Sequence, residues 1–184
     1  MISLKQFYEA IEVAGQVLDS RYKAFRMDNG RNKPDMRSWL GLGSCHCCDY
    51  FLLSKHTVLI EEKMLADKTK EIEKKVARLS ENDREKYVLA EIIKGLRLQI
   101  YGSLFMLSRL ALQCGKLLGD NTKHDFWFVD SGLEKENAKY FQYVKARLFS
   151  DLRSVLTKNF IEDIAVMSVD ELKQRLDKCK ALKT

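Results

Sequence analysis

Two short apolar runs separated by a polar turn stand out in the first third of the chain. Residues 50–53 (Tyr-Phe-Leu-Leu) form the first run, and residues 58–60 (Val-Leu-Ile) form the second. The four residues between them, 54–57 (Ser-Lys-His-Thr), are polar. Apolar runs of this length on either side of a short polar segment predict an antiparallel β-hairpin.

A helical spacing of apolar residues predicts the elements on each side of this hairpin. Over residues 2–26, apolar side chains recur every three or four positions, which predicts an N-terminal helix with one buried face. A polar loop and a short strand near residues 37–40 are predicted between this helix and the hairpin. After the hairpin, residues 64–120 are predicted to be helical, with a charged helix over 64–79 and then a long apolar helix.

The long apolar helix carries its apolar residues mainly on one face, from Leu89 to Leu118. We favour core packing for this face, and the alternative is a homodimer interface. At about 1.5 Å per residue, a helix of this length is longer than a small domain. We therefore expect either a break near Gly102 or an exposed end that pairs with a second copy.

The last third of the chain alternates between strand and helix patterns. The predicted elements are a strand at 126–129, a helix at about 134–157, a strand at 160–167 and a helix opened by a capping box of Ser168 and Glu171. Strands that alternate with helices indicate an α/β (α+β) fold, with a central mixed sheet flanked by helices. The length of 184 residues predicts one domain, residues 1–184.

Charged residues lie at the two ends of the predicted hairpin that should meet. Asp49 comes directly before the first strand, and Glu61, Glu62 and Lys63 follow the apolar part of the second strand. In an antiparallel hairpin the start of one strand lies beside the end of the other, so Asp49, Glu61 and Lys63 are expected to converge. Two carboxylates beside one ammonium group are suited to a hard divalent cation and an activated water.

This arrangement resembles the PD-(D/E)xK nucleases, a superfamily with a restriction-endonuclease-like fold. Its signature is an Asp at the start of one hairpin strand and (Asp/Glu)-x-Lys at the end of the next. The resemblance implies that Asp49, Glu61 and the backbone carbonyl of Glu62 bind Mg²⁺ (or Mn²⁺). It implies that Lys63 orients the attacking water and helps to stabilise charge on the phosphate. It also implies that the two late strands join the same sheet as the hairpin, in a restriction-endonuclease-like core.

The sequence departs from the signature at one position, because Cys48 and not Pro precedes Asp49. A literal Pro-Asp pair occurs at Pro34 and Asp35, but no apolar strand follows it. Members of the superfamily often carry an acid on a helix before the hairpin that reaches the metal. Glu12 is the better-placed residue for this role in the predicted N-terminal helix, and Glu9 is the reserve.

Basic residues are concentrated just before the predicted site. The net charge is +6 with a pI near 9.0, which fits a polyanionic partner. A basic loop beside a metal could bind phosphates through its cations. The candidate nucleic-acid-binding residues are Arg21, Lys23, Arg26, Arg31, Lys33 and Arg37. We therefore expect a metal-dependent nuclease that acts on nucleic acid, with DNA favoured as the substrate.

A competing hypothesis is a non-catalytic nucleic-acid-binding or helical assembly protein, since the basic residues and the long apolar helix would serve it equally well. Five cysteines, an odd number, point to a reducing cytoplasm and not to a disulfide scaffold. The apolar run from Leu96 to Leu112 contains too many polar residues for a membrane span, so we expect no membrane partner. Whether the cysteines at 45–48 bind metal stays open at this point.

Overall fold

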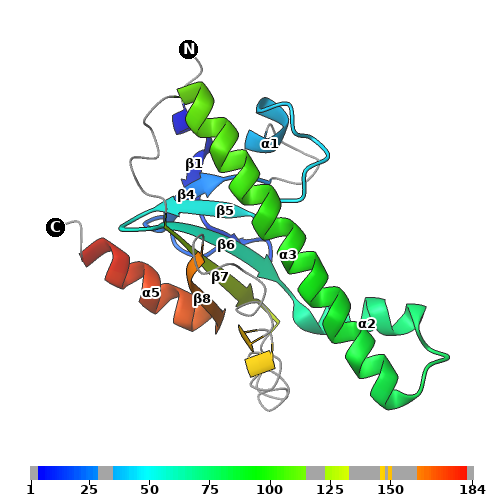
Figure 1. Cartoon of the computed structure of the whole chain (residues 1–184). Coiled ribbons are helices and arrows are strands. Elements are labelled where there is room, and N and C mark those ends of the chain that lie inside the picture. Colours follow the sequence, from blue (N-terminus) through cyan, green and yellow to red (C-terminus); the bar gives the residue numbers. More distant parts are fainter. Residues whose placement is uncertain are drawn as a thin grey trace.

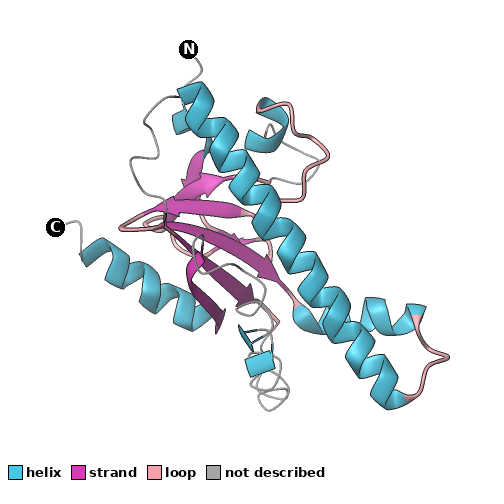
Figure 2. Ribbon diagram, in the orientation of Figure 1, coloured by secondary structure: helices cyan, strands magenta, loops and turns pink. Residues whose placement is uncertain are grey.

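A six-stranded mixed sheet forms the centre of the computed structural model (Figures 1 and 2). The residues that the structure describes are 4–28, 35–114, 123–132, 146–147, 149–150 and 161–181. The strands, in spatial order, are β1 (Tyr8–Ala10), β4 (Lys23–Arg26), β5 (Tyr50–Leu53), β6 (Thr57–Lys63), β7 (His124–Asp130) and β8 (Ile161–Ser168). Neighbours from β1 to β6 are antiparallel, whereas β6, β7 and β8 are parallel. The predicted α/β architecture and the predicted hairpin are thus confirmed.

Helices cover both faces of this sheet. Helix α3 (Glu81–Cys114) crosses one face, and α5 (Val169–Ala181) packs on the other (Figure 1). Strand β6 contributes to both layers, because its side chains alternate between the two faces. Leu59 joins the buried cluster on the α3 side, while Val58 and Ile60 join the cluster that contains α5 residues.

The predicted N-terminal helix over residues 2–26 is wrong. A 3₁₀ turn (Leu4–Phe7) is followed by β1, a small hairpin of β2 (Glu12–Val13) and β3 (Gln16–Val17), and then β4. Ala14 and Gly15 connect β2 to β3 with φ of 51° and 74°, and positive φ at both central residues is the requirement of a type I′ hairpin turn. The apolar spacing over this segment fitted a helix. The turn at Ala14 and Gly15 and the long-range pairing of β4 with β5 instead stabilise strands.

The predicted strand near residues 37–40 is also wrong, because this segment forms helix α1 (Met36–Trp39). Asp35 caps its N-terminus, with Oδ1 accepting a hydrogen bond from the N–H of Ser38 at 2.6 Å. Asp35 is therefore a structural residue of a helix start, which agrees with the preference for Asp49 as the acid of the motif.

The helical segment after the hairpin consists of α2 (Leu65–Lys75) and α3. In Figure 1, α2 and the first turns of α3 extend beyond the sheet. Helix α3 continues through Gly102, so the predicted break there is wrong. Its apolar face packs on the sheet through residues such as Ile92, Leu96 and Ile100, which confirms the favoured core role. Along the described part of the chain, no helix is both long and apolar enough to cross a membrane.

The late elements agree with the sequence pattern where they are described. Strand β7 includes the predicted strand at 126–129, and β8 covers residues 161–167 of the strand predicted at 160–167; both join the central sheet. The predicted helix at about 134–157 falls almost entirely outside the described residues. The capping box is confirmed, because the Ser168 N–H donates to the Glu171 carboxylate at 2.8 Å and the Glu171 N–H donates to Ser168 Oγ at 3.3 Å.

Candidate functional site

The antiparallel pairing of β5 and β6 brings the charged ends of the hairpin together. Asp49 Oδ2 accepts a hydrogen bond from the backbone N–H of Glu62 at 2.8 Å. Glu61 and Lys63 are two residues apart on β6, so both project from the same face of the sheet, and the Lys63 ammonium donates to Glu61 Oε1. The convergence expected for Asp49, Glu61 and Lys63 is therefore present.

Two separate elements hold the backbone around Asp49. The N–H of Met27, at the end of β4, donates to the carbonyl of Asp49 at 2.8 Å. The N–H of Cys48 donates to Ser103 Oγ on α3 at 2.8 Å. The position of the Asp49 carboxylate thus depends on a neighbouring strand and on the long helix as well as on its own hairpin.

Glu61 lies in an unusual environment for a carboxylate, because only 1% of its surface is exposed. Its Oε1 accepts hydrogen bonds from Lys63 Nζ and from Gln99 Nε2 on α3. Its Oε2 is buried and has no hydrogen-bond partner among the described residues, and neither has the Gln99 Oε1 atom. Two buried acceptor oxygens without donors indicate a place where a cation or a proton is needed.

The pKa shifts in the site also indicate that a cation or a proton is needed beside Glu61. Burial, and next to it the nearby charge of Asp49, raise the pKa of Glu61 to about 8 against the opposing effects of Lys63 and Gln99. Burial raises the pKa of Asp49 to about 6, although the Glu62 N–H and Lys63 oppose the shift. Burial disfavours the charged form of Lys63, but Glu61 and Asp49 outweigh this and raise its pKa overall. One ammonium group is too little positive charge for a buried Glu61 carboxylate and a partly buried Asp49 carboxylate.

The donor set fits a hard divalent cation such as Mg²⁺ or Mn²⁺. Within the described ranges, no group of three or more His, Cys, Asp and Glu side chains is arranged to hold a metal. The site offers two carboxylates, and Mg²⁺ in enzymes is commonly held by one or two carboxylates, with waters and substrate phosphates as its other ligands. A cation held by Asp49 and Glu61 would give Glu61 Oε2 the partner that it lacks.

Cys47 and Cys48, directly before Asp49, are buried thiols, and Cys45 is partly buried. Cys47 and Cys48 are 3% and 0% exposed. Burial raises the pKa of both thiols, which disfavours the thiolate that binds metals. Cys47 and Cys48 pack in the same core cluster as the buried face of α3.

The predicted role of Glu12 at the metal gains no support, because its described side-chain partner is Arg26 and not a residue of the site. Glu12 lies in β2, where its carboxylate bonds to Arg26 at 2.9 Å. Glu9, the reserve, bonds to the same guanidinium at 2.8 Å. The prediction rested on a helix that the segment does not form. Both acids instead neutralise a partly buried arginine.

The predicted basic residues do not form one group. Arg26 is paired with Glu9 and Glu12, and Arg37 is paired with Asp28 at 2.9 Å. Arg21 and Lys23 lie near Ser54, at the end of the hairpin far from Asp49. Arg31 and Lys33 lie outside the described residues. Nucleic-acid binding by this set stays a prediction, and the described members give it little support.

Three supporting residues of the site were missed at the sequence level. Gln99 reaches Glu61, and Ser103 holds Cys48, both from α3. Asp130, at the end of β7, accepts hydrogen bonds from the N–H of Leu65 at 3.1 Å and of Gly132 at 3.0 Å, which fixes the start of α2 directly after Lys63. Gln99 and Ser103 are polar residues within an apolar helical run, and that is the only signal the sequence carried.

The buried Glu61 predicts an unusual pH dependence of stability in the metal-free protein. Between its ordinary pKa of 4.5 and about 8, the folded protein holds a proton that the unfolded chain has released. The free energy of unfolding should therefore fall as the pH rises through this window. Urea unfolding in EDTA at pH 5, 7 and 9 checks this, and a stability that is constant or rises with pH would contradict it.

No family model, no curated protein and no solved structure matches this chain. The function proposed below therefore rests on the residues of the site and on the sheet that positions them.

Proposed function

We propose that this protein is a divalent-metal-dependent nuclease of the PD-(D/E)xK type, which hydrolyses phosphodiester bonds in nucleic acid, with DNA as the favoured substrate. The observation that carries the proposal is the convergence of Asp49, Glu61 and Lys63 at the end of one hairpin, with Glu61 Oε2 buried and without a donor among the described residues.

The order of strands supports the same proposal. The Asp strand and the Glu-x-Lys strand form an antiparallel hairpin, and β7 lies parallel to β6 on its other side. Helices cover both faces of this mixed sheet. This is the arrangement expected for a restriction-endonuclease-like core, although the strands β1 and β4 stand where the resemblance implied a helix.

Each residue of the site has a chemical role in this proposal. Asp49 and Glu61 would hold the cation, together with the backbone carbonyl of Glu62. When bound, the cation supplies polarisation of the scissile phosphate and lowers the pKa of a coordinated water. Gln99 fixes the orientation of the Glu61 carboxylate by its hydrogen bond from α3.

Lys63 is a residue of the site that solvent and substrate can reach, in contrast to the buried Glu61. Its side chain is 36% exposed, while that of Glu61 is 1% exposed. Its raised pKa keeps it protonated at neutral pH. The ammonium group can therefore donate to a phosphate oxygen or orient the attacking water, and it would stabilise the negative charge that develops on the phosphate.

A cleavage assay with a matched lysine control tests this function. Purified protein is incubated with plasmid, single-stranded DNA and RNA in Mg²⁺ or Mn²⁺, and with EDTA as the negative control. Lys63→Ala should lower the rate by about 10²-fold or more, because it removes the charge at the phosphate. Lys55→Ala, in the turn at the opposite end of the hairpin, should leave the rate unchanged.

The outcomes separate this proposal from its competitor. Cleavage that survives Lys63→Ala would contradict the assignment of the site. If the wild type cleaves none of the three substrates but binds them in a salt-sensitive manner, the non-catalytic nucleic-acid-binding reading would replace the nuclease.

A further inference from the structure

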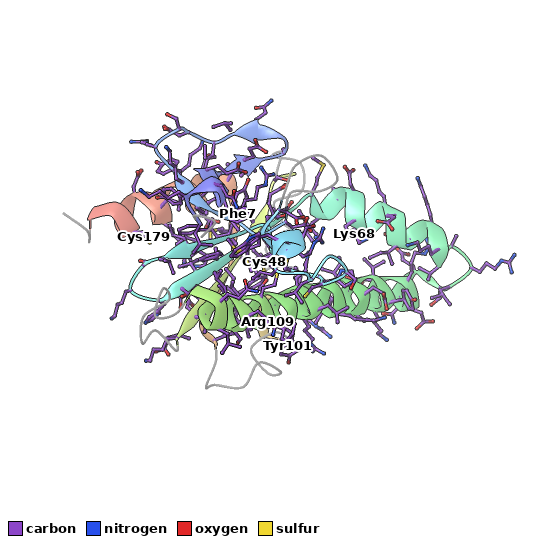
Figure 3. The ribbon with its side chains drawn as sticks, turned by 90° about the horizontal axis from the view of Figure 1, so that it is seen from above. Phe7, Cys48, Lys68, Tyr101, Arg109 and Cys179 are labelled. Atoms are coloured by element: carbon purple, nitrogen blue, oxygen red, sulfur yellow. The ribbon has the colours of Figure 1, made fainter. Side chains whose placement is uncertain are left out.

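The outer face of α3 carries a stripe of exposed apolar side chains. The side that faces the sheet supplies buried residues such as Ile100, Leu107 and Leu110. On the opposite side, Leu98, Tyr101, Phe105 and Leu112 are 48%, 50%, 53% and 78% exposed. In Figure 3, Tyr101 lies on the side of α3 that faces away from the sheet, and Arg109 on the same helix is exposed. Large apolar side chains gathered on one helical stripe mark an interaction surface.

The positions of the stripe are spaced symmetrically about Phe105. Leu98 and Leu112 are each seven residues from Phe105, and Tyr101 and Arg109 are each four residues from it. Spacings of three and four residues place all five side chains on one seam of the helix. When such a seam meets its own copy in the antiparallel direction, each residue meets its mirror position, as a two-fold axis requires.

We propose that this stripe binds the same stripe of a second copy of the chain, with the two α3 helices antiparallel and the two-fold axis at Phe105. Phe105 then packs against Phe105 of the second copy, and Leu98 packs against Leu112. Tyr101 meets Arg109, so the one cationic side chain of the seam lies over an aromatic ring. The pairing therefore gives the charge of Arg109 a complementary group.

The apolar area of the stripe sets the expected strength of dimerisation. Half-exposed aromatic side chains and two leucines offer roughly 400–500 Å² per protomer, against about 800 Å² per partner in stable interfaces. We therefore expect a concentration-dependent dimer with a micromolar dissociation constant. Gln99 lies on another side of the helix and bonds to Glu61, so the interface does not involve the proposed metal site.

Sedimentation velocity over a concentration series tests the dimer, with a matched aromatic control on the same helix. Phe105→Glu places two like charges together on the axis and should weaken dimerisation by at least about tenfold. Tyr87→Glu should have no effect, because Tyr87 is 44% exposed on the same helix but lies 11 residues before Leu98, beyond the five positions that pair. A wild type that stays monomeric at about 100 µM, or an equal loss in both variants, would overturn the proposal.

Cysteine cross-linking tests the antiparallel direction. Under mild oxidation, Phe105→Cys should form a disulfide-linked dimer beyond the wild-type background of native cysteines. Leu98→Cys should cross-link with Leu112→Cys when the two proteins are mixed, and not with itself. Efficient self-linking of Leu98→Cys would indicate parallel helices and would overturn the two-fold arrangement.

Discussion

Replacement of Glu61 by Gln is expected to abolish metal-dependent cleavage while making the protein more stable at alkaline pH. Cleavage should fall by well over about 10²-fold, because loss of a direct ligand exceeds the 10–100-fold effect of removing an outer-shell partner. Stability should rise because Gln cannot ionise, whereas the buried Glu61 must lose its proton above about pH 8. The substitution removes the charged partner of Lys63, but the Lys63 side chain is 36% exposed, so water can solvate its ammonium group.

The stability gain should depend on pH in a defined direction. At pH 9 we expect the free energy of unfolding of Glu61→Gln to exceed that of the wild type by on the order of 1–3 kcal/mol. At pH 5 the wild-type carboxyl is protonated, so the difference should largely disappear. Urea unfolding of both proteins in EDTA measures this, and a variant that is less stable than the wild type at pH 9 would contradict the account.

Glu162→Gln provides the control for this experiment. Glu162 lies on β8 of the same sheet and pairs with Lys123 at 3.1 Å, but its side chain is 45% exposed. Because its charge remains solvated, the substitution should change neither cleavage nor the pH dependence of stability.

Replacement of Gly102 by Ala is expected to destabilise the protein although it removes a glycine from a helix. A Cβ at this position would lie 1.7 Å from the carbonyl oxygen of His46 and 2.9 Å from Cys45 Sγ. The loop before Asp49 would have to move away from α3. Overpacking costs about 1–3 kcal/mol, and overlap with a backbone oxygen favours the upper part of this range, above the gain of about 1 kcal/mol in helix propensity.

Gly95→Ala on the same helix is the matched control. No atom lies within 4 Å of a Cβ built at Gly95, so only the helix propensity changes. This variant should gain up to about 1 kcal/mol in stability. Thermal unfolding of the two variants measures the difference, and a Gly102→Ala protein as stable as Gly95→Ala would refute the close contact between α3 and the loop.

The hairpin and its acids could be predicted because their signal is local. Two apolar runs on either side of a polar turn fix the strands, and antiparallel pairing then places Asp49 beside the end of β6. Strands β7 and β8 were predictable for the same reason, since their apolar runs are short and continuous. The pairing between these strands, however, is long-range and entered only through the resemblance.

The N-terminal segment failed because its pattern is ambiguous. Ile11 and Val13 alternate with polar residues as in a strand, while the wider spacing of apolar residues also fits one face of a helix. The turn at Ala14 and Gly15 lacks the Asn-Gly or Asp-Gly pair that usually marks a type I′ turn. The predicted role of Glu12 as a metal ligand depended on this helix and lost its basis with it.

The supporting residues could not be predicted because they act across long distances in sequence. Gln99 is 38 residues from Glu61, and Ser103 is 55 residues from Cys48. Local periodicity placed both correctly on a helix but carried no information about the partner of either. The burial of Glu61, which raises its pKa, arises because that helix crosses the sheet.

A calorimetric titration of the metal-free wild type with Mn²⁺ at pH 8 tests the central claim most directly, with Asp49→Asn and Glu61→Gln titrated in parallel. We expect one ion bound per chain in the wild type and no binding in either variant. Absence of binding to the wild type, or equal binding to all three proteins, would contradict a metal site formed by Asp49 and Glu61.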